Sequence, residues 1–250
     1  MKKRKAGIGI FVIVLIITAV RVKSMDSHRI SGRILAENIA GPGMLRLVEQ
    51  SMQAQARKTS VTEIAVKERK HPQAALTFDD GPDIRYTPLL LDGLKERNVR
   101  VSFFLLGEKV EQYPELVERM QKEGHLVGNH TYHHVQLNKL NETKAREEIL
   151  KTNNLIYETT GVYPLYLRPP FGAWKKNLEL CVEMLPVFWT IDTLDWKVQN
   201  TEKIVRTVQE QIEDGAIILM HDEYDTSVEA ALQVVDELKN QGYELVTVDQ

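Results

Sequence analysis

The sequence predicts an α/β protein in which parallel strands and helices alternate around a closed or nearly closed barrel. From Ala74 onward, short apolar runs alternate with longer amphipathic segments. Polar residues able to bind metals or move protons follow five of the seven apolar runs. Short continuous apolar runs are typical of parallel strands that helices cover on both faces. About seven strand–helix units favour a (β/α) barrel, and an open doubly wound sheet is the alternative.

The expected elements follow in order along the chain. The runs predicted as strands are 74–78, 101–106, 125–129, 165–167, 186–191, 216–220 and 243–248. The amphipathic segments predicted as helices lie at 87–98, 110–124, 141–161, 177–185, 201–215 and 227–242. Asn141 or Thr143 can cap the third helix. Four glycines stand where helices should end: Gly124, Gly161, Gly215 and Gly242.

Composition narrows the class of protein. The chain has 250 residues, 43% hydrophobic and 27% charged, which suits one large domain with a small appendage. A net charge of -3 and few aromatic residues give no reason to expect a nucleic-acid partner. The single cysteine, Cys181, cannot form an internal disulfide and is expected to be a buried, inert thiol. We expect a monomer.

The N-terminus predicts export. Four basic residues at positions 2–5 precede an uncharged apolar run, Ala6–Val20. No small-x-small cleavage site is evident before Met25, so an uncleaved membrane anchor is favoured over a signal peptide. The basic residues before the apolar run predict that the N-terminal end stays in the cytoplasm. We therefore expect a signal-anchor over 1–23, a stalk over 24–72 and a domain over 73–250, outside a bacterial cell membrane or secreted after cleavage.

Two adjacent acids, Asp79 and Asp80, end the first predicted strand in "ALTFDDGPD". Like charges so close repel, unless both face water or a cation holds them. His130 and His134 are four residues apart, so on a helical turn they would share a face and bind one ion. One aspartate would complete the site and the other would act as a base beside it. Such a two-histidine, one-carboxylate site leaves positions open for water and substrate.

Other polar residues follow later strands. Arg168 ends the fourth run, Asp192 and Asp195 follow the fifth, and His221 follows the sixth. In a βα barrel the carboxyl ends of the strands meet at one face, where the chemistry is found. The shared position of these residues at one rim therefore predicts an active site.

Five ordered motifs, "TFDDGP", "HTYHH", "RPPFG", "DTLDW" and "LMH", resemble those of the polysaccharide deacetylase family, also called the NodB-homology or carbohydrate esterase family 4. The resemblance covers roughly 74–248. It implies a distorted (β/α) barrel and a divalent metal. It also implies removal of acetyl groups from N-acetylated sugars or from acetylated xylan.

The resemblance assigns the metal and the base. Asp80, His130 and His134 resemble the metal ligands. Asp79 resembles the general base, and Arg168 the arginine that holds that base. Zinc is the favoured ion, with cobalt and nickel as alternatives.

The resemblance also assigns the acid and the acetyl pocket. His221 resembles the general acid, and Asp195 the carboxylate that tunes it. The backbone N–H of Phe171, where the family often has tyrosine, resembles the oxyanion donor. Trp196 and Leu219 resemble the walls that contact the acetyl group.

The expected activity is N-deacetylation of a cell-envelope polysaccharide, with peptidoglycan favoured because an anchored, outward-facing enzyme meets the wall first. An O-acetyl esterase and a non-catalytic glycan-binding protein are the alternatives. Ordinary structural roles are expected for some neighbours: Asp192 as a turn cap, Trp189 as packing, and Asp222 in a solvated acidic loop.

Overall fold

The computed structural model describes residues 70–174 and 184–250 of the chain. Lys70–Gln250 forms one compact unit. The expected anchor and most of the expected stalk, together with most of the helix predicted at 177–185, lie outside the described residues. Within the described ranges, no helix is both long and apolar enough to cross a membrane.

The sheet confirms the predicted barrel-like architecture. Its strands run in the order β5-β4-β3-β2-β1-β7-β6, and β8 pairs with β1. All pairings among the described strands are parallel. The strands are β1 (Gln73–Asp79), β2 (Ser102–Leu105), β3 (Leu126–Asn129), β4 (Tyr166–Leu167), β5 (Leu185–Pro186), β6 (Ile191–Asp192), β7 (Ala216–His221) and β8 (Glu244–Val246).

Strand β1 is the centre of the sheet. Residues 74–79 are all buried, as expected for a strand covered on both faces. Its first half pairs with β8 and its second half with β2, while β7 pairs along its other edge. This register sets Asp79 opposite Phe104 of β2 on one side and His221 of β7 on the other. Two residues predicted for catalysis are thus neighbours across one pair of strands.

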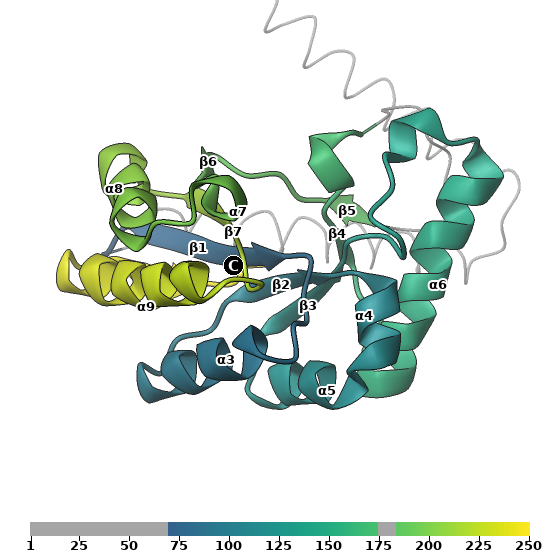
Figure 1. Ribbon diagram of the computed structural model, residues 1–250, viewed down its shortest axis with the longest axis horizontal. Helices are drawn as coiled ribbons and strands as arrows, with labels where there is room; N and C mark the ends of the chain where they lie inside the picture. Colours follow the sequence, from purple (N-terminus) through teal and green to yellow (C-terminus); the bar gives the residue numbers. More distant parts are fainter. Residues whose placement is uncertain (1–69, 175–183) are drawn as a thin grey trace, which may run out of the picture. The chain divides into compact units, whose positions relative to one another are not determined.

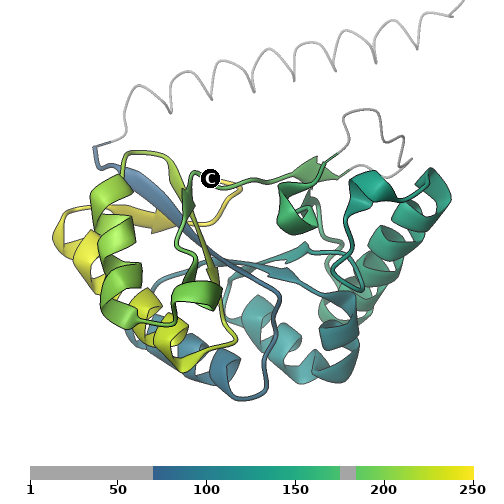
Figure 2. The ribbon, with the colours of Figure 1, turned by 45° about the horizontal axis from the view of Figure 1, so that its top comes forward.

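Helices cover the outer surface of the curved sheet (Figures 1 and 2). In Figure 1, α8 and α9 lie at one end and α6 at the other, with α3 and α5 between them. Asn141 caps α6, because its side chain accepts from the Lys144 N–H at 2.9 Å, and Gly161 ends that helix at φ 71°. The helices are α3 (Tyr86–Glu96), α4 (Gly107–Gln112), α5 (Pro114–Lys122), α6 (Glu142–Thr160), α7 (Asp195–Val198), α8 (Thr201–Gln211) and α9 (Asp225–Asn240), with 3-10 turns η1 (Leu137–Lys139) and η2 (Pro170–Gly172).

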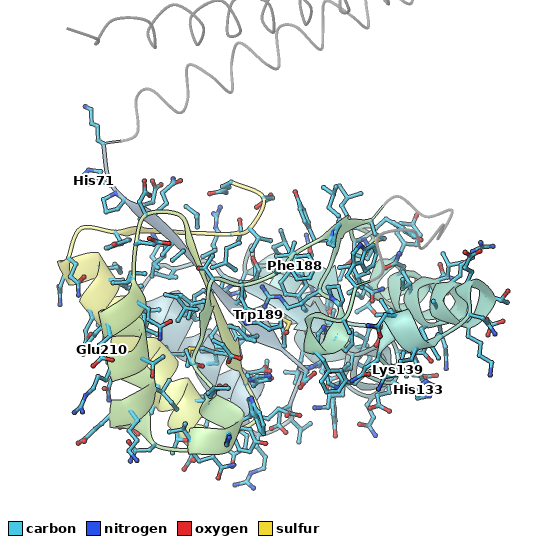
Figure 3. The ribbon with its side chains drawn as sticks, turned by 90° about the horizontal axis from the view of Figure 1, so that it is seen from above. His71, His133, Lys139, Phe188, Trp189 and Glu210 are labelled. Atoms are coloured by element: carbon cyan, nitrogen blue, oxygen red, sulfur yellow. The ribbon has the colours of Figure 1, made fainter. Side chains whose placement is uncertain are left out.

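The fifth predicted strand, 186–191, is wrong as a single element. Its ends belong to β5 and β6, which lie at opposite ends of the sheet. The Val187 N–H donates to the Leu167 carbonyl at 2.8 Å, whereas the Thr190 N–H donates to the Ile217 carbonyl at 2.9 Å. This segment therefore bonds to both ends of the sheet and nearly closes the barrel. Figure 3 shows Phe188 and Trp189 in that crossing.

Gly128 in the middle of β3 tests how tightly the sheet packs. An added Cβ would lie 2.7 Å from the Phe104 ring and 3.0 Å from the Tyr166 carbonyl oxygen, and backbone cannot move aside cheaply. We expect Gly128→Ala to lower the free energy of unfolding by about 1–3 kcal/mol, the usual cost of overpacking. Denaturant unfolding measures this. Gly161→Ala is the comparison, since its Cβ meets nothing and only its φ of 71° opposes the change. A cost at Gly128 near zero would contradict the packing argument.

Candidate active site

The chemistry-bearing residues meet at the carboxyl ends of the strands. A cavity of about 430 Å³ opens there. It contains nearly all the predicted site residues; Arg168 and Asp195 lie beneath it, buried. The residues that line it are Asp79, Asp80, His130, His134, Phe171, Trp189, Asp192, Trp196, Leu219, His221, Glu223 and Tyr224.

Asp79 is held by a buried ion pair. The Nη1 of Arg168 donates to Asp79 Oδ1 at 2.8 Å and to Thr77 Oγ1 at 2.7 Å, and the arginine side chain is fully buried. The guanidinium also lies over the Phe104 ring, with its carbon 4.3 Å from the ring centroid. Burial raises the pKa of Asp79, and the Arg168 charge opposes that rise. The result is a basic carboxylate with a fixed orientation.

Three potential metal ligands converge beside this pair. Asp80 Oδ1 lies 3.4 Å from His130 Nε2 and 3.5 Å from His134 Nε2. Ligand atoms about 2.0–2.1 Å from a tetrahedral ion are about 3.3 Å apart, so these separations fit one shared ion. The candidate ligand atoms all lie within 4.8 Å of one another.

The protonation of these groups also fits a cation. His130 Nδ1 lies 2.6 Å from the Arg168 carbonyl oxygen, which can only accept, so Nδ1 carries the proton and Nε2 presents a lone pair. Burial lowers the pKa of His130 to about 3, so the ring is neutral. Asp80 Oδ1 is buried and has no hydrogen-bond partner among the described residues. Acceptor atoms that face one another without a shared proton suit a metal ion.

The loop that carries both histidines is not helical, and the expected helical turn is wrong. Thr131 and His134 have positive φ values of 68° and 54°. The side chains of Asn129 and Glu148 hold the loop. Asn129 Oδ1 accepts from the Thr131 N–H at 2.7 Å. Glu148 accepts from the N–H and ring of His133, at 2.9 and 2.8 Å. The histidines converge because these neighbours fold the loop, a feature that spacing alone cannot reveal.

His221 and Asp195 form the second charged pair. Asp195 is fully buried, and its two oxygens accept from the His221 ring and the His221 backbone N–H, both at 2.7 Å. Burial lowers the pKa of His221, but the Asp195 bond and the charges of Asp79 and Asp80 outweigh it and raise the pKa to about 9. His221 is therefore protonated at neutral pH, opposite to His130.

Comparison with known proteins identifies this arrangement. A family model described as "Polysaccharide deacetylase" matches residues 66–187. A peptidoglycan-N-acetylglucosamine deacetylase of Bacillus cereus is 36% identical over 184 residues, covering 70% of this chain and 86% of the relative. The chain belongs to the polysaccharide deacetylase family.

Other members of the polysaccharide deacetylase family agree. Peptidoglycan-N-acetylglucosamine deacetylase PgdA of Listeria monocytogenes is 41% identical over 184 residues, or 74% of this chain and 40% of the relative. The structure of peptidoglycan deacetylase PdaC from Bacillus subtilis aligns with a TM-score of 0.70 at 41% identity, covering 72% of this chain and 90% of that one. The aligned part spans only about 40% of the length of PgdA.

The residues expected to contact the acetyl group line the cavity of this family member. Leu219 is buried on β7, and Trp196 is 49% exposed at the start of α7. Phe171 has a φ of 59°, and its ring lies 4.5 Å from the His134 ring, centroid to centroid. An exposed aromatic ring beside a polar centre suits a sugar face.

Four further residues line the cavity although the sequence analysis gave them no catalytic or binding role. Trp189 was expected only to pack, yet it lines the cavity and lies over the Arg168 guanidinium. Asp192 accepts from the Leu194 N–H at 3.0 Å, the turn-capping role that was expected, and also faces the cavity. Glu223 and Tyr224 come from the loop after His221, which the sequence marks only by its position beyond a motif.

Breaking the Arg168–Asp79 pair should cost much of the domain's stability. Arg168→Met leaves Asp79 buried without its partner, and losing one member of a buried pair costs about 3–5 kcal/mol. Denaturant unfolding of the metal-free protein measures this. Arg97→Met is the matched control, because its pair with Asp236 is partly exposed and should cost under about 1 kcal/mol. The loss should shrink in an Asp79→Asn background, and equal losses in both backgrounds would contradict the pairing.

The His221–Asp195 pair predicts how stability depends on pH. A histidine with a raised pKa stabilises the fold fully below its unfolded pKa of about 6.5. That contribution is lost as pH rises through about 9. Asp195→Asn lowers the pKa of His221 and removes the contribution, which is on the order of 3 kcal/mol. We therefore expect the free energy of unfolding of the metal-free protein to fall between pH 6 and pH 9, and to fall more for wild type than for Asp195→Asn. Equal falls would refute the raised pKa.

Proposed function

We propose that the chain is a metal-dependent hydrolase that removes acetyl groups from the N-acetylated sugars of peptidoglycan. One observation carries the proposal: three converging metal-ligand atoms lie between a buried aspartate base and a protonated histidine. His130 Nε2 lies 3.6 Å from Asp79 Oδ2, and His221 Nε2 lies 3.8 Å from Asp80 Oδ2. A base, an ion site and an acid within such short reach suit hydrolysis of an amide.

Asp80, His130 and His134 would hold the divalent ion, with zinc favoured and cobalt or nickel possible in the same donor set. The bound ion would act as a Lewis acid on the acetyl carbonyl and would lower the pKa of water at the site. The charge of the ion would also offset the repulsion between the adjacent Asp79 and Asp80 carboxylates.

Asp79 is the proposed general base. It accepts a proton from the attacking water as the new C–O bond forms at the acetyl carbon. Its pKa is raised by burial, which makes it a stronger base than an exposed aspartate, while Arg168 holds its orientation and favours its ionised form. The arginine is a positioning residue, since it lies beneath the cavity and reaches the reaction through Asp79.

His221 is the proposed general acid. It gives its proton to the sugar nitrogen as the C–N bond breaks, which releases acetate and a free amino sugar. Asp195 holds the ring through Nδ1, so Nε2 faces the cavity with the proton to be transferred. The pair therefore supplies both the proton and its direction.

The acetyl group would lie against Leu219 and Trp196, with its carbonyl oxygen near the Phe171 N–H. Charge that develops on this oxygen would be stabilised by that N–H, a contribution of the kind that often dominates acyl transfer. Because the donor belongs to the backbone, it does not need the tyrosine hydroxyl that the family often has at this position.

The relatives named for peptidoglycan favour that polymer as substrate. The apolar run Ala6–Val20 supports an anchored protein whose domain lies outside the cell membrane, where the wall is the nearest polymer. We further propose that the protein acts as a monomer.

Acetate release by the purified full chain tests the function. Zinc-loaded protein should release acetate from peptidoglycan, lose this activity to a chelator and regain it with zinc. Asp79→Asn should lower kcat at least about 10²-fold, because the general base is lost. Asp236→Asn, an exposed aspartate on α9, is the matched control and should leave the rate unchanged.

Parallel assays separate the competing functions. Acetate from acetylated xylan but not from peptidoglycan or chitin oligomers would favour an O-acetyl esterase. Tight glycan binding without acetate from any substrate would favour a non-catalytic binding protein. Activity that survives removal of all metal would refute the proposed mechanism.

A further inference from the structure

Asp222, directly after His221, is buried rather than solvated as its sequence context suggested. Its relative exposure is 0%. The Thr87 hydroxyl donates a hydrogen bond to Asp222 Oδ2, while Oδ1 has no partner among the described residues. Burying a carboxylate with one unpaired oxygen lowers the free energy of unfolding, so its presence suggests a role that compensates for this cost.

Thr87 connects Asp222 to the loop that carries Asp80. Its hydroxyl also accepts from the Asp83 N–H at 2.7 Å, and its own N–H donates to the Asp83 carbonyl at 3.1 Å. Asp83 in turn accepts from the N–H groups of Arg85 and Tyr86, which fixes the start of α3. One chain of hydrogen bonds thus runs from the end of β7 to the turn after Asp80.

Gly81 shows how closely the two loops approach. An added Cβ would lie 2.5 Å from Asp222 Oδ1 and 2.9 Å from Oδ2. Gly81 does not have a positive φ, so backbone conformation does not require glycine there. An added side chain would instead meet the carboxylate packed against Gly81, and one of the two would have to shift. The Gly81 carbonyl accepts from the Leu106 N–H at 3.2 Å, which holds the loop from its other side.

The loop needs such support. Asp80 has a φ of 69°, a left-handed conformation that a residue with a side chain keeps only when its surroundings enforce it. If the loop relaxed, Asp80 Oδ1 would leave its position between the two histidines. Whether Asp80 stays there therefore depends on the side chains that contact Gly81 and Asp83, the residues that follow it in the loop.

We propose that Asp222 and Thr87 form a buried clamp that positions Asp80 for metal binding and fixes its separation from His221. The proposal rests on the metal site of the proposed function. Asp222 and Thr87 are positioning residues, because neither is among the residues that line the cavity. The clamp joins the first and last motifs, whose catalytic side chains come from neighbouring strands β1 and β7.

Zinc affinity of the full chain tests the clamp, measured by competition with a chromophoric chelator. Thr87→Val keeps the shape of the side chain and removes both hydrogen bonds, so we expect zinc binding to weaken at least tenfold. Thr87→Ser restores the hydroxyl and should bind within twofold of wild type. On a glycan substrate at saturating zinc, Thr87→Val should lower kcat more than it changes KM.

Ser102→Ala is the matched control. The buried hydroxyl of Ser102 accepts from the N–H of Val248, which is distant in the sequence. Ser102 lies at the end of β2 that is far from the cavity. Ser102→Ala should lower the melting temperature without changing zinc affinity. Gly81→Ala is a second route to the same result, because its Cβ would displace Asp222 or the loop, and zinc binding should again weaken.

Several outcomes would overturn the clamp. The proposal fails if Thr87→Val and Gly81→Ala fold and bind zinc as wild type does, or if Ser102→Ala weakens zinc binding equally. Wild-type protein that binds no zinc would also overturn it. Wild-type protein that binds zinc but releases no acetate would refute the proposed hydrolase, while the zinc affinities still decide for or against the clamp.

Discussion

Arg168 is the residue on which the rest of the site depends. Its guanidinium is buried and bonds Asp79, which neutralises the charge that would otherwise be costly inside the fold. Its carbonyl oxygen accepts the Nδ1 proton of His130 and so turns the other ring nitrogen toward the cation site. Its backbone N–H donates to the Asn129 carbonyl at 2.9 Å and joins β4 to the end of β3. One residue therefore orients the Asp79 carboxylate and the His130 ring and joins β4 to β3.

The adjacent acids at the end of β1 coexist because they have different partners. Asp79 remains in the strand and pairs with a fixed cation, the Arg168 guanidinium. Asp80 leaves the strand at a φ of 69° and points one oxygen at two histidine nitrogens. The change of backbone conformation between the two residues lets both carboxylates face the same cavity. Two neighbouring residues in the same extended conformation would point to opposite faces, and only one could reach the cavity.

Much of this could be predicted because parallel strands place their ends together. The positions of Asp79, His130, Arg168 and His221 after apolar runs were enough to expect one rim, and the register of β1 with β7 supplies the contact. The division of 186–191 between two ends of the sheet could not be predicted, since an apolar run does not reveal its hydrogen-bond partners. The burial of Asp222 could not be predicted either, because its hydrogen-bond partner, Thr87, lies 135 residues away in the sequence.

The histidines show how partners set function within one cavity. His130 and His221 are both largely buried, and burial alone would make both neutral. The Nδ1 of His130 meets a carbonyl, which accepts a proton but carries no charge, so the ring stays neutral and can bind a cation. The Nδ1 of His221 meets the carboxylate of Asp195, whose charge favours the protonated ring. One side-chain type is thus suited to bind a cation at His130 and to donate a proton at His221, and the acceptor behind each ring decides which.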